Sequence, residues 1–219
     1  MIDLKSMVLP EMEEYFRSLD LPRFRSKQVF SWLHEKRAAS FDEMTNLPLS
    51  LRQQLAEQCT LTTLVIERKL VSQLDGTIKY LYRLPDGNHI ESVLMRYEHG
   101  NSLCISSQVG CKMGCAFCAS TKAGFVRNLT PSEILEQVYM AGRDTGEKIS
   151  NIVMMGIGEP LDNYDNVLRF LELVSDPNGL NLSHRHISLS TCGVVDKIYD
   201  LADRDLQITL SISLHATTD

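Results

Sequence analysis

The sequence predicts an α/β protein in which a helical unit and a few antiparallel strands precede a parallel sheet. Three observations predict this class. Apolar residues recur at helical spacing up to about residue 60, β-rich runs follow to about residue 99, and strands then alternate with helices. Alternating strands and helices are typical of βαβ units. We therefore expect a helical domain at 1–60, a small antiparallel β segment at 61–99 and a parallel β/α region at 100–219.

Within the first 60 residues, three stretches have the helical pattern: "EMEEYFRSL", "RSKQVFSWLHEKR" and "SLRQQLAEQ". The stretches "DLPRF" and "TNLPLS" separate them and contain turn residues. From residue 61, the runs around "TLVIERKLV", "IKYLYRL" and "HIESVLMRY" are broken by Asp75-Gly76 and by Pro85-Asp86-Gly87. Such turn signals between β-rich runs predict two or three antiparallel strands.

From about residue 100 the strands "LCISS", "NIVMMG", "HISLST" and "QITLSISLH" alternate with three helical stretches. The first of these helices has a marked start, because Thr130 can cap it, Pro131 suits its first position and Glu133 completes a capping box. The sheet could be open or barrel-like. Since a parallel barrel needs more units to close, we expect the chain to be the front part of a longer protein.

The composition limits the classes of function that the chain can have. Of 219 residues, 43% are hydrophobic and 23% charged, which is ordinary for a globular protein, and no apolar run is long enough to cross a membrane. We expect a cytoplasmic protein, in which clustered cysteines bind metal or react rather than form structural disulfides. The net charge of −6 argues against a broad nucleic-acid-binding face. A local basic site remains open, and its candidate residues are Arg23, Arg25, Lys27, Lys122 and Arg127.

The stretch "CISSQVGCKMGCAFC" contains four of the six cysteines. Cys111, Cys115 and Cys118 form C-x3-C-x2-C. This spacing lets one loop present three thiolates to a single bound group, such as a metal ion or an iron–sulfur cluster. A structural zinc site would need a fourth ligand, which Cys104 could supply from the preceding strand. The alternative is a [4Fe–4S] cluster with three cysteine ligands and one iron free for chemistry. Cys59 and Cys192 are interpreted as small buried residues of structural importance only.

A second motif, "MMGIGEP", ends the second strand of the alternating region. Leu161 stands where a dinucleotide-binding fingerprint would have its third glycine, so we discount a nucleotide-binding open sheet. Glycines at this strand end can expose backbone carbonyls to a ligand, and Glu159 adds a carboxylate suited to an ammonium group. Ser190, Ser213 and His215 lie at or just beyond the ends of the next two strands and should face the same edge.

These motifs together resemble the radical S-adenosylmethionine (SAM) superfamily. The stretches "CISSQVGCKMGCAFCASTKAGFVRNLTPSEILEQV", "NIVMMGIGEPLDN", "ISLSTCGVV" and "SISLHA" are similar to the RlmN/Cfr family of RNA adenine methyltransferases, and the likeness runs from about residue 15 to the end. It implies a partial radical-SAM (β/α) barrel with an N-terminal helical domain that binds RNA. "GEP" and "SSQVGC" resemble the RlmN branch, which modifies adenine C2; the Cfr branch, which modifies C8, tends to "GEA" and "SSQCGC".

The resemblance also implies roles for individual residues. Cys111, Cys115 and Cys118 would ligate a [4Fe–4S] cluster. SAM would contact the residues that match the family's cofactor site, which are Gly158, Glu159, Ser190, Ser213, Leu214 and His215. Glu91 matches an acidic residue with a proton-transfer role, for which it would have to reach the mouth of the barrel. Without the resemblance, Glu91 would be interpreted as an ordinary exposed strand carboxylate.

In the mechanism that the resemblance implies, one SAM methylates a cysteine near the C-terminus and a second SAM yields a radical that activates this methyl group. The resulting covalent protein–RNA adduct is released through a transient disulfide, and Cys104 matches the cysteine that forms it. The expected substrates are 23S rRNA and tRNA, with an external electron donor such as flavodoxin, no membrane and a monomeric protein. Since the methyl-carrying cysteine should lie beyond Asp219, we expect these 219 residues alone not to methylate RNA. A zinc-stabilised RNA-binding module without catalysis is the alternative from another functional class.

Overall fold

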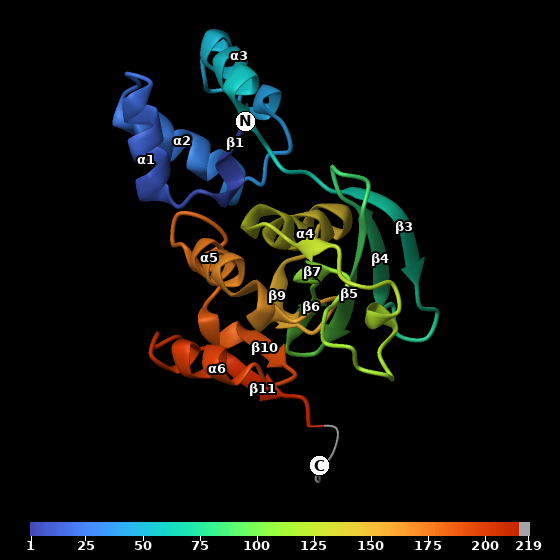
Figure 1. The fold of residues 1–219 in the computed structure, drawn as a ribbon. Helices are drawn as coiled ribbons and strands as arrows, with labels where there is room; N and C mark the ends of the chain where they lie inside the picture. Colours follow the sequence, from blue (N-terminus) through green and yellow to red (C-terminus); the bar gives the residue numbers. More distant parts are fainter. Residues whose placement is uncertain (215–219) are drawn as a thin grey trace.

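The computed structural model describes residues 1–214, in which a helical N-terminal unit lies against the helices that cover one large sheet (Figure 1). The N-terminal unit contains α1 (Leu9–Ser18), α2 (Arg23–His34) and α3 (Leu49–Gln58), at the three stretches where the sequence predicts helices. A short parallel pair, β1 (Ile2–Asp3) with β2 (Cys59–Thr60), joins the start of this unit to its end. Its core consists of fully buried apolar side chains such as Leu4, Met12, Phe16, Phe30, Leu33 and Leu55.

Buried polar contacts join the N-terminal unit to α4 (Pro131–Thr145). The ammonium of Lys5 donates to a carboxylate oxygen of Glu136 at 2.9 Å and to the backbone carbonyl of Thr62 at 2.8 Å. His34 Nδ1 lies 2.9 Å from the hydroxyl of Tyr139. All four side chains are fully buried. Because buried polar groups are costly unless they are paired, these contacts specify one orientation of the unit on α4.

The main sheet has seven strands in the order β11-β10-β9-β6-β5-β4-β3. Neighbours among β6, β9, β10 and β11 are parallel, and β3, β4, β5 and β6 form successive antiparallel pairs. The antiparallel strands predicted for 61–99 therefore extend the parallel sheet. Within the described residues the sheet is open, with β11 and β3 at its edges. Its strands are β3 (Val65–Val71), β4 (Ile78–Arg83), β5 (His89–Tyr97), β6 (Gly100–Cys104), β9 (Ile149–Met154), β10 (Ile187–Thr191) and β11 (Thr209–Ile212).

The helices α4, α5 (Tyr164–Ser175) and α6 (Val195–Ala202) follow the parallel strands along one side of the sheet (Figure 1). The alternation of side chains on β5 shows which face α4 covers. Ile90, Ser92 and Leu94 are buried, and the hydroxyl of Ser92 donates to Gln137 of α4 at 2.8 Å. The residues between them are partly exposed on the opposite face of the sheet, which α4 does not cover.

The start of α4 agrees with its sequence signature. The hydroxyl of Thr130 accepts a hydrogen bond from the backbone N–H of Glu133, whose carboxylate accepts from the backbone N–H of Thr130. Pro131 occupies the first turn, and Gly146 ends the helix in the left-handed region with φ of 70°. This reciprocal cap satisfies two backbone donors that would otherwise be unpaired, so α4 begins at a defined residue next to the cysteine loop.

Candidate functional site

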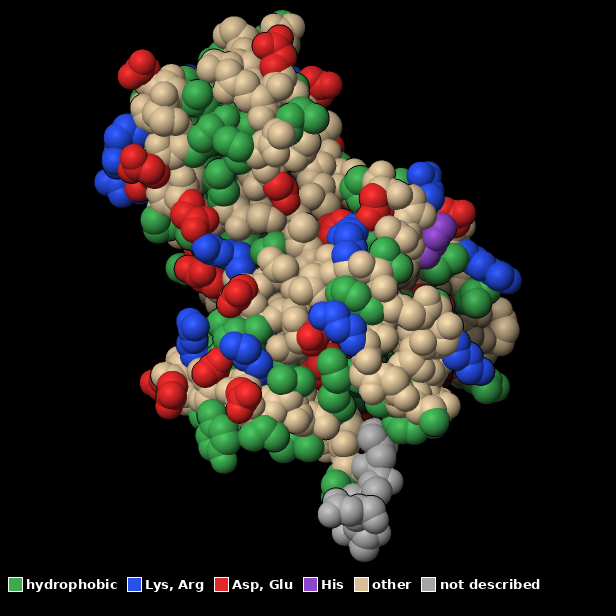
Figure 2. Space-filling view, viewed as in Figure 1, with side chains coloured by type: hydrophobic (Ala, Val, Ile, Leu, Met, Phe, Trp, Pro, Cys, Tyr) green, Lys and Arg blue, Asp and Glu red, His purple; other side chains and the backbone are tan. Residues whose placement is uncertain are grey.

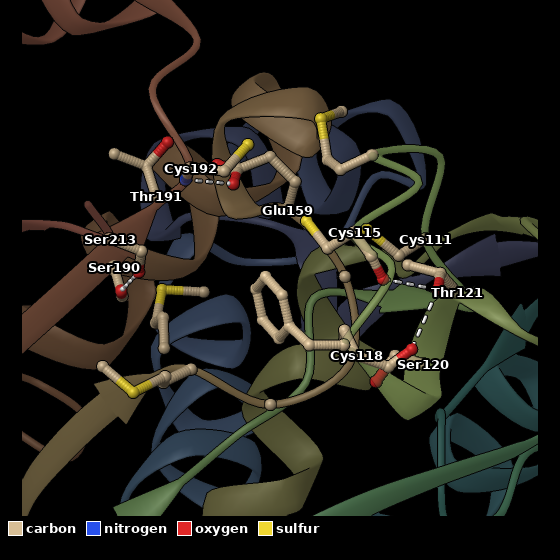
Figure 3. A pocket seen from close by; sticks show the side chains of 16 residues that line it. Cys111, Cys115, Cys118, Ser120, Thr121, Glu159, Ser190, Thr191, Cys192 and Ser213 are labelled. Atoms are coloured by element: carbon tan, nitrogen blue, oxygen red, sulfur yellow. Dashed lines mark hydrogen bonds between the residues drawn. The ribbon is translucent and has the colours of Figure 1, made fainter. Parts of the chain in front are cut away.

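A cavity of about 270 Å³ opens at the carboxyl ends of the parallel strands, between these ends and the cysteine loop (Figure 3). This is the edge at which ligands bind in open α/β sheets. The cavity brings together residues from four segments that lie far apart in the sequence. Its lining consists of Cys111, Met113, Cys115, Phe117, Cys118, Ser120, Thr121, Met154, Met155, Gly156, Gly158, Glu159, Ser190, Thr191, Cys192 and Ser213.

The cysteine loop is the connection of a small hairpin, β7 (Gln108–Val109) with β8 (Arg127–Asn128). Gly110 lies at the base of this loop with φ of 73°, and a Cβ there would lie 1.7 Å from the backbone oxygen of Gly124. Only glycine fits that approach. At the far end of the loop, the hydroxyl of Thr121 donates to the backbone carbonyl of Cys118 at 2.8 Å and to that of Cys115 at 3.1 Å. The loop is thereby closed at both ends and holds its thiols at the cavity.

The three loop thiols of Cys111, Cys115 and Cys118 are partly exposed and line this one cavity, as the spacing of the motif predicts. Burial raises the pKa of the Cys111 thiol above its usual range, with smaller contributions from Cys115, Glu159 and Cys118. All six cysteines of the chain are free thiols in this structure. Among residues 1–214, no three thiol, imidazole or carboxylate groups converge on a point where a single metal ion could be held.

The turn after β9 presents its backbone to the cavity because two glycines allow close packing. A Cβ on Gly156 would lie 2.6 Å from the backbone oxygen of Ile105, and Gly158 adopts φ of 103°. Next to them, Glu159 is only 4% exposed. One carboxylate oxygen accepts from the backbone N–H of Leu161 at 3.0 Å, and the other accepts from the backbone N–H of Cys192 at 2.9 Å. Glu159 therefore lies at the cavity wall with both oxygens oriented by backbone donors (Figure 3).

Ser190 of β10 and Ser213, which directly follows β11, meet at another part of the cavity wall. The hydroxyls of Ser190 and Ser213 lie 3.3 Å apart, and both residues line the cavity (Figure 3). Leu214 is 75% exposed and follows directly, outside the lining residues. His215 lies outside the residues that the structure describes. The prediction that the strand ends share one edge thus extends to Ser190 and Ser213.

Cys104 and Glu91 lie on neighbouring strands, and neither is among the lining residues of the cavity. Cys104 ends β6 and pairs with Val93 of β5. Glu91 is two positions from Val93, so its side chain is on the same face of the sheet as that of Cys104. The antiparallel direction of β5 brings Glu91 to the edge where the parallel strands end. There its carboxylate forms an ion pair with Lys79 at 2.9 Å, and burial raises the pKa of the Cys104 thiol.

The expectation for Cys192 is wrong, whereas Cys59 is buried as expected. Cys192 is exposed and lines the cavity, because it follows the last residue of β10, where the strand leaves the sheet. The sequence signal that could have indicated this exposure is the position of Cys192 directly after a buried strand. The sequence interpretation also assigned no role to Gln108, a fully buried amide at the base of the cysteine loop.

The surface around the site has no extended cationic face on the side shown in Figure 2, where Lys and Arg alternate with Asp and Glu. Of the basic candidates, Arg127 is bound to Asp86 and Glu133, and Arg23 to Glu13. Lys27 and Lys122 are exposed. In residues 1–214, no helix combines the length and apolar character that crossing a bilayer requires.

Two protein-family models match the chain. The model described as the N-terminal domain of ribosomal RNA large subunit methyltransferase matches residues 2–61, and that of the radical SAM superfamily matches residues 105–219. The second match begins directly after β6 and includes the cysteine loop, the turn after β9 and the ends of β10 and β11. The matched region is thus the one that forms the cavity.

Curated relatives are similar over the whole chain. Two of them, each named "Probable dual-specificity RNA methyltransferase RlmN", come from Lachnospira eligens and Alkaliphilus oremlandii and are 56% and 54% identical to it. The chain is covered completely and spans 63% of the length of each relative. Among solved structures, a radical SAM methyltransferase from Sphaerobacter thermophilus is 42% identical and superposes with a TM-score of 0.94, covering 100% of this chain and 65% of that one.

Proposed function

Because the chain belongs to the radical SAM superfamily and is of the RlmN type, we propose that a protein containing it methylates C2 of an adenine in 23S rRNA and in tRNA. Membership in the superfamily implies a [4Fe–4S] cluster and SAM as cofactors. The cluster and SAM together supply one-electron chemistry, which suits a ring carbon that is neither nucleophilic nor acidic enough for polar methyl transfer.

The observation that carries this proposal is that the cysteine loop and the turn after β9 line the same cavity. Thiolates are the usual ligands of iron–sulfur clusters, so the donor set of Cys111, Cys115 and Cys118 fits such a group. These thiols lie around a shared space without converging on one point. Three thiols at one cavity match a cluster that has three cysteine ligands and one iron left free. Cys104, the fourth ligand that a zinc site would need, lies outside the cavity lining.

The other lining residues are suited to SAM. We assign Gly158 and the buried carboxylate of Glu159 to the amino acid end of SAM, because a carboxylate in an enclosed site attracts an ammonium group. The paired hydroxyls of Ser190 and Ser213 can donate to and accept from its polar groups. Leu214 and His215 are assigned to the same cofactor on the family resemblance.

Cys104 and Glu91 are assigned to the release of the methylated RNA. Their side chains share the open face of the sheet at its active edge, where a nucleotide entering the partial barrel would meet them. We propose that Glu91 moves a proton and that the Cys104 thiol forms the transient disulfide. Burial raises the pKa of the Cys104 thiol, which favours the uncharged form until a base takes its proton. A methyl-carrying cysteine would complete the site in a protein of the relatives' length.

The first experiment tests the cofactors on the chain itself. After anaerobic reconstitution with iron and sulfide, we expect about four irons and four sulfides per chain and a broad absorption band near about 400 nm. Addition of SAM should change the electron paramagnetic resonance (EPR) spectrum of the reduced cluster. Tight binding of zinc alone, lost in Cys104→Ala, would instead support a zinc-stabilised RNA-binding module.

The second experiment tests the position of methylation. The protein of the relatives' length is incubated with SAM, a one-electron reductant such as flavodoxin, and 23S rRNA or tRNA that carries deuterium at adenine C2 or at C8. We expect loss of deuterium from C2 with methyl incorporation, and retention at C8. The opposite pattern would identify a C8 methyltransferase of the Cfr type. Gel filtration of the same preparation tests the proposed monomer, and fractionation of cells tests the proposed cytoplasmic location.

A further inference from the structure

Gln108 connects the cysteine loop to the turn after β9 through a fully buried side chain. Its amide oxygen accepts a hydrogen bond from the backbone N–H of Glu159 at 2.9 Å. Its amide nitrogen donates to Asn128 at 2.9 Å and to Asp162 at 2.6 Å. Both N–H donors of the amide are therefore used. The bond to Asn128 is made within the hairpin, whereas the bonds to Glu159 and Asp162 join the hairpin to the turn after β9 and the residues that follow it.

The turn also packs directly against Gln108. A Cβ on Gly158 would lie 2.5 Å from the Cβ of Gln108 and 2.8 Å from its backbone nitrogen. The backbone N–H of Gln108 donates to the carbonyl of Ile157 at 3.1 Å. The glycine and the glutamine thus leave no free space between the base of the cysteine loop and the turn, so a displacement of one segment moves the other.

A charged residue inside the cysteine loop strengthens the connection. Lys112, next to Cys111, forms an ion pair with Asp162 at 3.0 Å, and its ammonium lies 4.4 Å from the centre of the Phe125 ring. The Oδ2 atom of Asp162 therefore accepts from both Gln108 and Lys112. Hydrogen bonds to a carboxylate are stronger than bonds between neutral groups, and their geometry is more restricted.

We propose that Gln108 is a positioning residue that sets the distance between the cysteine loop and the Gly158–Glu159 turn. This inference rests on the proposed function, in which one ligand group contacts both segments. Gln108 does not line the cavity, so it acts through the backbone of Glu159 and through Asp162. Its loss should loosen the contact between the two segments without removing any thiol, which affects SAM more than the cluster.

Four variants of the chain test the inference: Gln108→Ala, Gln108→Glu, Asp162→Asn and the double variant Gln108→Glu/Asp162→Asn. Gln108→Glu places a second carboxylate against Asp162 and removes both donors. The double variant exchanges donor and acceptor in the hydrogen bond between positions 108 and 162, because the asparagine at 162 can donate to the new carboxylate at 108. That carboxylate can still accept from the backbone N–H of Glu159. Asn151→Ala is the control, since this amide of β9 bonds His186 at the other end of the strand.

Two measurements are made on each variant. The first is hydrogen exchange of segments 110–126 and 156–163 in the metal-free protein. The second is iron loading and the Kd of SAM after reconstitution. For Gln108→Ala and Gln108→Glu we expect iron loading within about twofold of the parent, about tenfold faster exchange in both segments and a SAM Kd raised about tenfold or more. Asp162→Asn keeps an oxygen that accepts from Gln108 but loses the charge that pairs with Lys112, so we expect it to raise the Kd by about threefold, less than either Gln108 variant. The Asn151→Ala control should change the Kd by less than about twofold.

The double variant tests whether the hydrogen bond between positions 108 and 162 is responsible for the effect. It should recover most of the exchange protection and SAM affinity that Gln108→Glu loses. Parent-like exchange and Kd in Gln108→Ala, or a double variant no better than Gln108→Glu, would overturn the inference. Should Gln108→Ala fail to fold, the comparison of Gln108→Glu with the double variant still tests it. A parent protein that takes up neither cluster nor SAM would refute the proposed function instead, while the exchange measurement would still report on Gln108.

Discussion

The carboxylate of Glu159 accepts a hydrogen bond from the backbone N–H of Cys192 at 2.9 Å, and the thiol of Cys192 lies against the same carboxylate. This contact joins the turn after β9 to the end of the neighbouring strand β10 along the cavity wall. The enclosure of the thiol raises the pKa of Cys192 to about 12, with further contributions from Glu159, Cys115 and Cys111. Cys192 therefore remains a neutral thiol at neutral pH.

Glu159→Gln should make Cys192 more reactive. Only the thiolate is alkylated, and removal of the adjacent negative charge lowers the pKa of Cys192, so a larger fraction is ionised at pH 8. We expect iodoacetamide to modify Cys192 in the metal-free variant about tenfold faster than in the parent. Site-resolved mass spectrometry measures the rate, with buried Cys59 as the internal control. Equal rates at Cys192 in both proteins would contradict the influence of Glu159.

The cysteines should fall into two groups when each is changed to serine. Loss of Cys111, Cys115 or Cys118 removes a thiolate from the cavity wall, and we expect iron retained after desalting to fall to less than about one third of the parent value. Cys104→Ser and Cys192→Ser should retain it, because Cys104 lies outside the cavity lining and Cys192 is held neutral beside Glu159. Iron and sulfide analysis of each variant checks this. Loss of iron in Cys104→Ser would instead favour a four-thiolate site.

Local patterns were enough to predict α1 to α6 and the strands of the main sheet, whereas the two-residue strands β1, β2, β7 and β8 were not predicted. The helical periodicity, the turn signals and the Thr130 capping box each depend on a few adjacent residues, so the sequence alone located α1 to α6 and the strands they connect. The shared edge of the strand ends and the cysteine loop was predicted from the general topology of parallel α/β sheets, whose active sites lie at the carboxyl ends of the strands. The periodicity, the turn signals and the capping box depend only on residues close together in the sequence, so they can be recognised without the tertiary structure.

Contacts between distant segments could not be predicted in this way. That the 61–99 strands extend the parallel sheet depends on the pairing of Val93 with Cys104, and no local pattern specifies that partner. The hydrogen bond of Cys192 to Glu159, 33 positions earlier in the chain, is a contact of the same kind. Gln108 has the same limitation, since its importance comes from Asn128, Glu159 and Asp162, which meet it only in the folded protein.

His34 should make the protein sensitive to mild acid. Burial, with a smaller effect of Lys5, lowers the pKa of His34 to about 3 in the folded state, whereas in the unfolded chain it is near about 6.5. The unfolded state therefore takes up the proton first. Stability is complete above about pH 6.5 and falls on the order of 1 kcal/mol per pH unit between there and about pH 3.

The comparison with His34→Gln isolates this contribution, since glutamine can still bond the Tyr139 hydroxyl but does not titrate. Urea unfolding between pH 7 and pH 5 should give a shallower loss of unfolding free energy for the variant than for the parent. Near neutral pH, where His34 is uncharged in both states, the two unfolding free energies should differ by a constant amount that does not change with pH. Parallel pH profiles would show that His34 does not titrate differently in the two states.

The buried ion pair between Lys5 and Glu136 should be strongly coupled. The two groups are 2.9 Å apart with side chains almost completely shielded from solvent, and Arg143 binds Glu136 from the other side. Lys5→Met leaves Glu136 with Arg143 alone, and removal of one partner of a buried pair costs about 3 kcal/mol. Lys5→Met/Glu136→Met removes both charges, so urea unfolding should show it to be less destabilised than the sum of the single variants.

The Glu136→Gln variant gives this coupling a pH signature. Burial already lowers the pKa of Lys5, and Glu136 is the main group that opposes this effect. Without that carboxylate, the folded-state pKa of Lys5 falls further below its unfolded value, so the unfolded state binds more protons and stability rises with pH. The deficit of Glu136→Gln relative to the parent should therefore shrink between pH 7 and pH 9.5. A deficit that stays constant over this range would mean that Lys5 does not depend on Glu136 for its charge.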